Sequence, residues 1–305
     1  MKYGVLILGT GVALGALVIP LFGGAPTLAP SAPASAQVLF GGDLMFDRFI
    51  RTVSESRGYD YPLSCIAARF AEYDLVVANL EGPITSSESV SVGSRVGTSE
   101  NTRFTFSPQV AAALLSSGID VVHLGNNHIL DFGRVGLLET KTNLGIARVA
   151  YFGDPDRSEE SRVLARDVNG VPLTLVSWND WADQSVPRTE AAIRAARDAD
   201  RVPVVFAHWG DEYVEAPDRT RELARRFVDA GALLVVGSHS HVVGASEEYR
   251  GVPIYYSLGN FVFDQYFSEA VQRGLLLSVV LTNDGVSRVD RIPIRLHKDG
   301  RTCPE

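Results

Sequence analysis

Two histidines follow a short apolar run near residue 235, where a buried strand is expected to end. The run 233–236 stops at Gly237, and His239 and His241 come directly afterwards. Neutral imidazole is the commonest protein ligand for zinc-like metals. In an open α/β sheet, ligand sites lie just beyond the carboxyl ends of the strands. The pair is therefore a candidate metal site, with histidines in a surface loop as the alternative.

Four further apolar runs end in residues of the same chemical kind. Asp43, Glu81 and His208 each come directly after such a run, and Asn127 and His128 follow another. Each has an ordinary structural alternative: Asp43 as a helix cap, Asn127 in a turn, His208 as a hydrogen-bonded core histidine. One shared site explains all five strand ends at once, whereas the alternatives require five coincidences.

The donor types in this set indicate a divalent metal. Imidazole and carboxylate ligands suit Mn²⁺, Zn²⁺ or Fe²⁺, and the number of donors is enough for one or two ions sharing a carboxylate. Two-metal sites activate water at neutral pH and stabilise the attacking and leaving oxygens of a displacement. A cysteine-based zinc site is excluded, because Cys65 and Cys303 are the only cysteines. Whether these two pair with each other is open.

The composition is that of a globular protein with an acidic balance. The chain has 305 residues, of which 46% are hydrophobic and 21% charged, and its net charge is −8. Lys and Arg do not cluster, so nucleic-acid binding is not expected. An acidic protein that binds an anionic substrate needs a local cation, which a metal or an arginine would supply.

The first 22 residues are predicted to be a signal peptide or a transmembrane anchor. The segment 5–22 is apolar and uncharged, which is close to the minimum length of about 17–25 residues for a membrane span. A small-residue cleavage site at 34–36 lies far beyond the apolar run, which favours the anchor. A flexible Pro/Ala/Ser linker is expected at 23–36. Either alternative places the remainder outside the cytoplasm.

From residue 37 onward, strand-like runs alternate with helical patterns, which predicts one α/β domain over 37–297 and a tail at 298–305. Residues 85–101 lack a hydrophobic period and are predicted to form a long loop of the kind that acts as a lid. Asn169-Gly170 predicts a hairpin. Strands are expected at 38–41, 75–78, 121–124, 148–152, 162–168, 171–177, 202–207, 233–236, 254–257, 273–282 and 286–295. Helices are expected at 66–73, 108–117, 133–144, 189–199 and 217–230.

Over roughly residues 38–265 the chain resembles the poly-γ-glutamate capsule biosynthesis protein CapA family. The resemblance implies the calcineurin-like metallophosphoesterase fold, a four-layer αββα sandwich, and a membrane-associated or exported protein. The blocks that carry it are Gly42-Asp43-Leu44-Met45, Asn79-Leu80-Glu81-Gly82, Asn126-Asn127-His128 with Asp131 and Gly133, His208-Trp209-Gly210 with Glu212-Tyr213, Gly237-Ser238-His239-Ser240-His241-Val242, and Tyr256-Ser257-Leu258-Gly259-Asn260-Phe261-Val262-Phe263-Asp264.

The resemblance also implies roles for the residues at the strand ends. His128 would stabilise or protonate the leaving group. Met45 stands where the superfamily's first metal motif has a histidine, so one ion has fewer ligands. The implied ligands are Glu81, Asn127, His208 and His239 for one ion, and Asp43, Glu81 and His241 for the other.

Residues near these blocks are candidates for the substrate site. Arg48 is expected to reach an anionic substrate group, with a plain surface arginine as the alternative. Asp131 is expected to orient His128 or to cap the helix that follows. Glu212 and Asn260 are expected to contact substrate. Trp178 and Trp181 are expected to pack in the interior, with a cleft wall as the alternative.

Two functions follow from these observations. The first is an extracytoplasmic metal-dependent hydrolase that cleaves a phosphoester or polymer-linked bond during capsule or cell-envelope assembly. The alternative is a metal-bound scaffold or polymer-binding component of a capsule export and anchoring complex. The expected partners are an anionic polymer or phosphoester substrate, membrane proteins of capsule synthesis, and the membrane itself through the N-terminal segment.

Overall fold

Two β-sheets form the centre of the protein in its computed structural model, which describes residues 1–4, 6, 8–9, 11, 34–155, 159–181 and 185–305. Residues Ala34–Glu305 form one compact unit. Most of the predicted N-terminal signal or anchor, and residues 23–33 of the predicted linker, lie outside the described residues. Among the residues that are described, no helix is long and apolar enough to cross a membrane.

The first sheet has eight strands within the described part of the chain. They run in the order β14-β13-β12-β1-β2-β3-β4, and β11 also pairs with β1. The pairs β1·β2, β2·β3 and β3·β4 are parallel. The strands are β1 (Ser35–Leu44), β2 (Leu75–Leu80), β3 (Val121–His123), β4 (Ala150–Phe152), β11 (Asn260–Val262), β12 (Arg273–Thr282), β13 (Gly285–Leu296) and β14 (Thr302–Pro304).

The second sheet has six strands in the described residues, in the order β5-β6-β7-β8-β10-β9. Its centre is parallel, and antiparallel strands form both edges. The strands are β5 (Val163–Val168), β6 (Val171–Asn179), β7 (Val202–His208), β8 (Leu234–Ser238), β9 (Ser246–Tyr249) and β10 (Val252–Tyr255).

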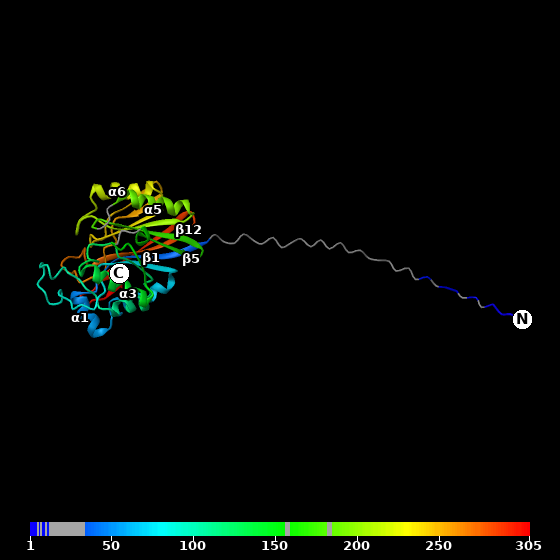
Figure 1. Ribbon diagram of the computed structural model, residues 1–305, viewed down its shortest axis with the longest axis horizontal. Helices are drawn as coiled ribbons and strands as arrows, with labels where there is room; N and C mark the ends of the chain where they lie inside the picture. The colour runs from blue at the N-terminus through cyan, green and yellow to red at the C-terminus, as the bar shows by residue number, and fades with distance from the viewer. Residues whose placement is uncertain (5, 7, 10, 12–33, 156–158, 182–184) are drawn as a thin grey trace. The chain divides into compact units, whose positions relative to one another are not determined.

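The helices lie on the outer faces of the two sheets, as Figure 1 shows for α5 and α6 on one side and α1 and α3 on the other. The described helices are α1 (Arg48–Arg57), η1 (Tyr61–Leu63), η2 (Ala67–Glu72), α2 (Gln109–Ser117), α3 (Gly133–Ala147), α4 (Glu159–Arg162), α5 (Val186–Asp198) and α6 (Asp218–Asp229). The α/β architecture expected from the sequence is confirmed.

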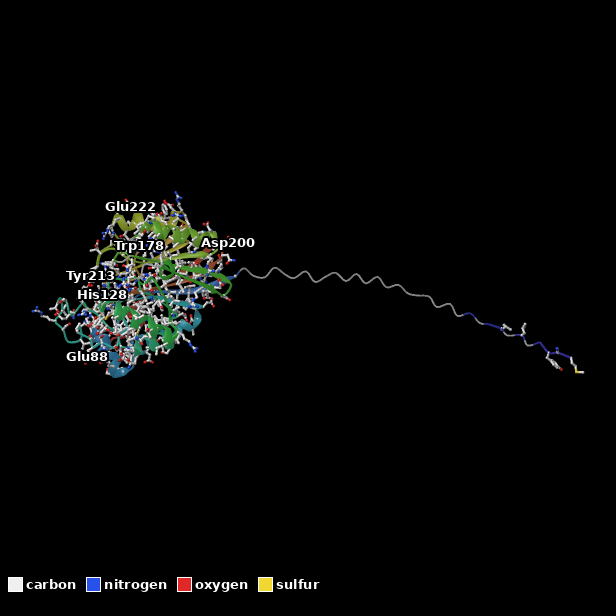
Figure 2. All side chains as sticks on the ribbon, viewed as in Figure 1. Glu88, His128, Trp178, Asp200, Tyr213 and Glu222 are labelled. Carbon is white, nitrogen blue, oxygen red and sulfur yellow. A yellow bond between two sulfur atoms is a disulfide. The ribbon has the colours of Figure 1, made fainter. Side chains whose placement is uncertain are left out.

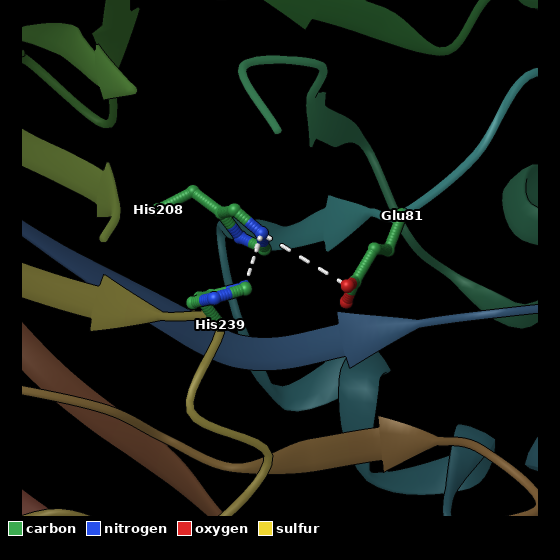
Figure 3. Close-up of side chains that lie close together, drawn as sticks. All are labelled: Glu81, His208 and His239. Atoms are coloured by element: carbon green, nitrogen blue, oxygen red, sulfur yellow. Dashed lines mark hydrogen bonds and ion pairs between the residues drawn. The ribbon is translucent and has the colours of Figure 1, made fainter. Parts of the chain in front are cut away.

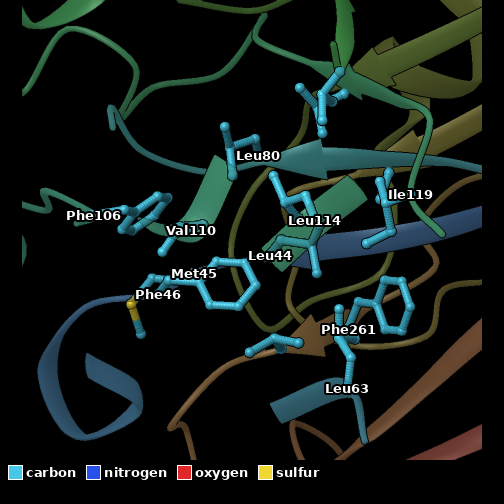
Figure 4. Packing of buried hydrophobic residues seen from close by; sticks show 14 of the residues in the cluster. Leu44, Met45, Phe46, Leu63, Leu80, Phe106, Val110, Leu114, Ile119 and Phe261 are labelled. Carbon is cyan, nitrogen blue, oxygen red and sulfur yellow. The ribbon is translucent and has the colours of Figure 1, made fainter. Parts of the chain in front are cut away.

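Side-chain alternation along the buried strands creates three hydrophobic layers. On β1, Phe40 faces the second sheet and packs with Phe206. Its neighbour Leu39 faces the opposite way, into the core beneath the outer helices, part of which Figure 4 shows. A third core lies between the second sheet and helices α5 and α6, where Phe227 packs on Trp178. The period of two residues in a strand is the reason one strand serves two cores.

Most predicted elements are present, with boundaries shifted by a few residues. The hairpin at Asn169-Gly170 is confirmed, with Val168 opposite Val171 and φ values of 47° and 82° at the turn. These positive values are those of a type I′ turn.

The short or polar elements α1, β9, β11 and β14 were not expected. The anticipated tail contains β14, and the last residues of the linker begin β1. The strands β9, β11 and β14 were not predictable because they are too short to show a hydrophobic period. Pairing with neighbouring strands is what forms them. Cys65 and Cys303, left open by the sequence, form a disulfide that joins β14 to the segment before η2.

Candidate metal centre

The carboxyl ends of β1, β2, β7 and β8 bring acidic and imidazole side chains from both sheets to one place. Two groups of buried donors form there, and within each group the donor atoms lie within 4.8 Å of one another. The first consists of Glu81, His208 and His239 (Figure 3). The second consists of Asp43, Glu81 and His241. Glu81 belongs to both groups, as a bridging carboxylate would.

His208 is the centre of the first group. Its Nε2 lies 3.2 Å from His239 Nδ1, 3.9 Å from Glu81 Oε1 and 2.8 Å from Asn127 Oδ1. On the other side of the ring, Nδ1 lies 2.8 Å from Ser238 Oγ, whose own proton goes to the Ala207 carbonyl. His208 Nδ1 therefore donates to Ser238, which leaves the Nε2 lone pair facing the other donors.

Hydrogen bonds also orient the donors of the second group. His241 Nδ1 donates to Asn260 Oδ1 at 2.9 Å, so Nε2 faces Glu81 Oε1 at 3.7 Å. The Asp43 carboxylate accepts from Asn79 Nδ2 at 2.8 Å and from the backbone N–H of His239 at 3.1 Å. These bonds fix the orientation of the donors before any ligand binds.

The loop after β8 bends sharply to place its two histidines. His239 and His241 have φ values of 96° and 58°, in the left-handed region that side chains other than glycine rarely adopt. Each such residue costs about 1–3 kcal/mol, and strain of this kind is concentrated at functional sites. The bend directs both rings to the same side, although they are only two residues apart.

Glu81 supplies the direct test of whether a cation fits. Both of its carboxylate oxygens are buried, and neither has a hydrogen-bond partner among the described residues. A buried carboxylate without a partner is costly, so such groups are paired or coordinate metals. Here Glu81 Oε1 lies 3.9 Å from His208 Nε2 and 3.7 Å from His241 Nε2, and Glu81 shares its second donor group with the Asp43 carboxylate. Imidazole and carboxylate together are the donor set of a divalent ion such as Mn²⁺, Zn²⁺ or Fe²⁺.

Burial sets the protonation of these groups. It raises the pKa of Asp43 to about 7 and, together with the nearby Asp43 charge, raises the pKa of Glu81 well above its usual range. Burial lowers the pKa of His239 to about 4 and depresses the pKa values of His208 and His241 strongly. The imidazoles are therefore neutral at pH 7, with lone pairs available for a metal.

Met45 contributes no donor to the second group. Its side chain is fully buried in the core beneath the outer helices (Figure 4), and its sulfur accepts from the backbone N–H of Asp47 at 3.0 Å. Three side chains are thus left for this position. A thioether would in any case be a weak ligand for these metals.

His128 and Asp131 form a hydrogen-bonded pair beside the two groups. His128 Nδ1 lies 2.9 Å from Asp131 Oδ2, and the same oxygen accepts from the backbone N–H of Phe104 at 2.7 Å. The Phe104 ring packs on His128 at 4.4 Å. Phe132, not Asp131, is the residue before helix α3, and that helix start has no side-chain cap. Asp131 therefore orients His128, and the helix-cap alternative is wrong.

The predicted substrate residues have different surroundings. Arg48 forms an ion pair with Asp264, and its guanidinium lies over Phe104 and Phe263. Glu212 is exposed, and the pKa of Tyr213 is raised mainly by burial of the tyrosine and further by the nearby Glu212 charge.

Asn260 is fully buried, which does not suit the substrate contact expected of it. Its amide is used within the protein, donating to Gln265 Oε1 at 3.1 Å and to the Val271 carbonyl at 3.0 Å. Its oxygen holds His241. Asn260 is a positioning residue.

Trp181 and Asn79 belong to the site, although the sequence indicated a cleft-wall role for Trp181 only as an alternative and no role for Asn79. The Trp181 ring packs on His239 at 4.3 Å and is partly exposed, so the cleft-wall alternative describes it, whereas Trp178 is buried. Trp181 follows the end of β6 by two residues. Its position after a strand end, like that of the metal-ligand candidates, was the sequence signal that could have placed it at the site. Asn79 Nδ2 lies 3.3 Å from His208 Nδ1 in addition to its bond with Asp43.

Residues 37–265 match the model of the family described as bacterial capsule synthesis protein PGA_cap. The chain belongs to this family. One relative, "PGA biosynthesis protein CapA" of Bacillus subtilis (strain 168), is 30% identical over 279 residues, which is 85% of this chain and 71% of the relative.

A second relative, "Capsule biosynthesis protein CapA" of Bacillus anthracis, is 28% identical over 277 residues. That alignment covers 84% of this chain and 66% of the relative. The resemblance to the CapA family inferred from the sequence blocks is confirmed.

Proposed function

We propose that this protein is a divalent-metal-dependent hydrolase of the calcineurin-like metallophosphoesterase type that cleaves a phosphoester or polymer-linked bond in capsule or cell-envelope assembly. The observation that carries the proposal is the unpartnered, buried Glu81 carboxylate shared by two donor groups. Helices outside two facing sheets agree with the four-layer fold of that superfamily. Membership in a capsule synthesis family supports the biological context.

The chain's own residues would divide the work between metal binding and proton transfer. Glu81, Asn127, His208 and His239 would hold one ion, and Asp43, Glu81 and His241 a second. A bound divalent ion supplies Lewis acidity, which polarises a phosphoryl or carbonyl oxygen. Asp131 holds His128 at Nδ1, so His128 Nε2 is free to give a proton to the leaving-group oxygen.

Metal analysis and hydrolysis assays on the same preparations test this proposal. The full chain should contain one or two ions per molecule and hydrolyse a phosphodiester such as bis-p-nitrophenyl phosphate. His208→Ala and His239→Ala should lose metal and turnover while keeping the circular-dichroism spectrum of the folded protein. His128→Gln should keep the metal and lose turnover. Hydrolysis that persists after the metal has been removed would refute the proposal.

An extracytoplasmic location belongs to the proposal, and the Cys65–Cys303 disulfide supports it, because disulfides persist in oxidising compartments. The N-terminal segment would export or anchor the chain beside membrane partners of capsule synthesis. Thiol labelling of whole-cell lysates under denaturing conditions tests this. The full chain should resist labelling, and a chain without residues 1–22 should be labelled. Equal labelling of both would contradict the proposed location.

A metal-bound scaffold or polymer-binding component is the second candidate function. The observation that favours it is Met45, whose side chain lies in the core and leaves the second donor group with three side chains. A protein that holds one ion, is inert towards phosphoesters and retains poly-γ-glutamate in a pull-down would select this function over hydrolysis.

A further inference from the structure

Exposed aromatic side chains gather around the candidate metal centre. In the described part of Ala34–Glu305, the aromatic residues with the most exposed side chains are Phe49, Trp181, Tyr213 and Phe267, at 40–67%. Trp181 packs on His239. Tyr213 packs on His241 at 5.8 Å and on Phe267 at 5.3 Å. Exposed rings are costly in water, and their confinement to one region marks a binding surface.

These rings lie on both sides of the donor groups. Trp181 contacts the histidines of the first group, at 4.3 Å from His239 and 5.5 Å from His208. Tyr213 contacts His241 of the second group. Figure 2 shows Tyr213 and His128 at one end of the compact unit and Asp200 at the opposite end. A ligand that touched both Trp181 and Tyr213 would extend across the metal centre.

A groove of about 670 Å³ continues from Tyr213 between α1, the loop 85–101 and the segment after β11. Phe49, Tyr266 and Phe267 supply its apolar surface, and the Phe49 and Tyr266 rings pack edge to face at 6.5 Å. Ser89 of the loop donates to Asp47 at 2.6 Å, which ties the loop to the start of α1. The walls of the groove are therefore connected to ordered elements.

The polar part of this lining is almost entirely uncharged. Neutral hydroxyl and amide groups come from Ser94, Asn101, Thr102 and Gln265. Among the described lining residues, Arg48 is the single cation, and its charge is already paired with Asp264. A polyanion carries a charge on every unit and requires several unpaired cations along its path. The groove does not provide them.

We propose that this groove binds a neutral glycan chain and directs it across the metal centre. The C–H faces of sugar rings are apolar and stack on aromatic side chains, whereas sugar hydroxyls bond to hydroxyl and amide groups. The lining offers both kinds of surface. This inference rests on the proposed function for what happens at the metal, and it assigns the substrate class as glycan rather than polyglutamate.

Calorimetric titration of the full chain with tetra-N-acetylchitotetraose and with a γ-linked glutamate oligomer of equal length tests the inference. The neutral glycan should bind, and the glutamate oligomer should bind at least about tenfold more weakly. Phe267→Ala and Phe49→Ala should each weaken glycan binding by about tenfold, because one aromatic contact of this kind is lost. Ile146→Ala, which removes an exposed apolar side chain on α3 that does not line the groove, should bind as the unaltered protein does.

Three results would overturn the inference. They are tighter binding of the glutamate oligomer with strong salt dependence, failure of the glycan to bind, and unchanged glycan affinity in both phenylalanine variants. Metal content should be equal in all variants, and the titration is repeated on chelator-treated protein. Glycan binding without metal-dependent hydrolysis would refute the proposed hydrolase and leave the groove inference standing. Hydrolysis without glycan binding would refute the groove inference and leave the proposed hydrolase standing.

Discussion

Glu81 is the residue on which the chemistry of the site most depends. Its carboxylate is buried without hydrogen-bond partners and lies between neutral imidazoles. Burial raises its pKa, so the carboxyl group favours the protonated form in the metal-free protein. The unfolded chain ionises near the ordinary pKa of 4.5. The metal-free protein therefore loses stability from Glu81 as the pH rises above that value, and a bound cation removes the loss.

Glu81→Gln should stabilise the metal-free protein and weaken metal binding. The neutral amide avoids ionisation, so we expect a gain of about 1–3 kcal/mol at pH 8 and little gain at pH 4. Denaturant unfolding of chelator-treated protein at both pH values measures the gain, and elemental analysis measures the metal. Glu222→Gln, an exposed change on α6, is the matched control. A less stable Glu81→Gln protein at pH 8 would show that the carboxylate has a favourable partner.

Asn260→Ala should weaken metal binding without touching a donor atom. The substitution removes the acceptor of His241 Nδ1 and frees the ring to rotate or change tautomer. Loss of such a partner typically costs about 10–100-fold in metal affinity. We expect the ion held by His241 to be lost first, which competition with a chelating dye would detect. Asn260→Asp restores an acceptor and should recover much of the affinity. Equal affinity in Asn260→Ala and the unaltered protein would contradict this role.

At the scale of elements, the site depends on the close approach of β1 to the segment that precedes β11. Asp43 on β1 is opposite Asn260 on β11, so this pairing sets the separation between a donor and the residue that holds His241. Gly42 allows the approach, because a Cβ at this position would lie 1.9 Å from the Gly259 carbonyl oxygen. The backbone contact therefore requires glycine.

Gly42→Ala should destabilise the protein by about 3 kcal/mol or more and reduce its metal content, because the backbone must move at the site. Denaturant unfolding and elemental analysis measure the two effects. Gly145→Ala is the matched control. It lies within α3, where a Cβ meets no atom within 4 Å, so it should stabilise by about 0.5–1 kcal/mol. A Gly42→Ala protein with unchanged stability would mean that β1 can move away without cost.

At the scale of the whole molecule, the disulfide closes a very long loop. Cys65 and Cys303 are 238 residues apart in sequence, so the bond restricts most of the compact unit in the unfolded state. It joins β14 at the edge of the first sheet to the segment before η2, and thereby fixes the end of the chain on the fold.

Replacing both cysteines, Cys65→Ser with Cys303→Ser, should lower the free energy of unfolding by about 2–5 kcal/mol, because the unfolded chain gains conformational entropy. Denaturant titration measures the change. The unaltered protein in reducing buffer should lose a similar amount, and the double variant should be indifferent to the reductant. Equal stability of the oxidised and reduced forms would show that the bond contributes nothing to folding.

The sequence by itself was sufficient for much of the site. Buried parallel strands appear as continuous apolar runs, and a polar residue directly after such a run stands at the ligand-binding edge of a sheet. Asp43, Glu81 and His208 follow this rule, and so do the histidines after β8. The α/β class and the hairpin at Asn169-Gly170 were predictable for the same reason, because each depends on local patterns. The division of the donors into two groups was implied by the resemblance to the CapA family and not by any local pattern.

Only the tertiary structure decided which of these groups touch, and how. His239 and Asp43 are hydrogen-bonded although 196 residues separate them, and no local pattern specifies such a pair. The tertiary structure likewise decided four other features. They are the disulfide, the burial of Asn260, the core position of Met45 and the exposed rings beside the metal centre. Each results from packing the two sheets and their loops together, because burial and partnership are properties of the assembled chain and not of any one segment.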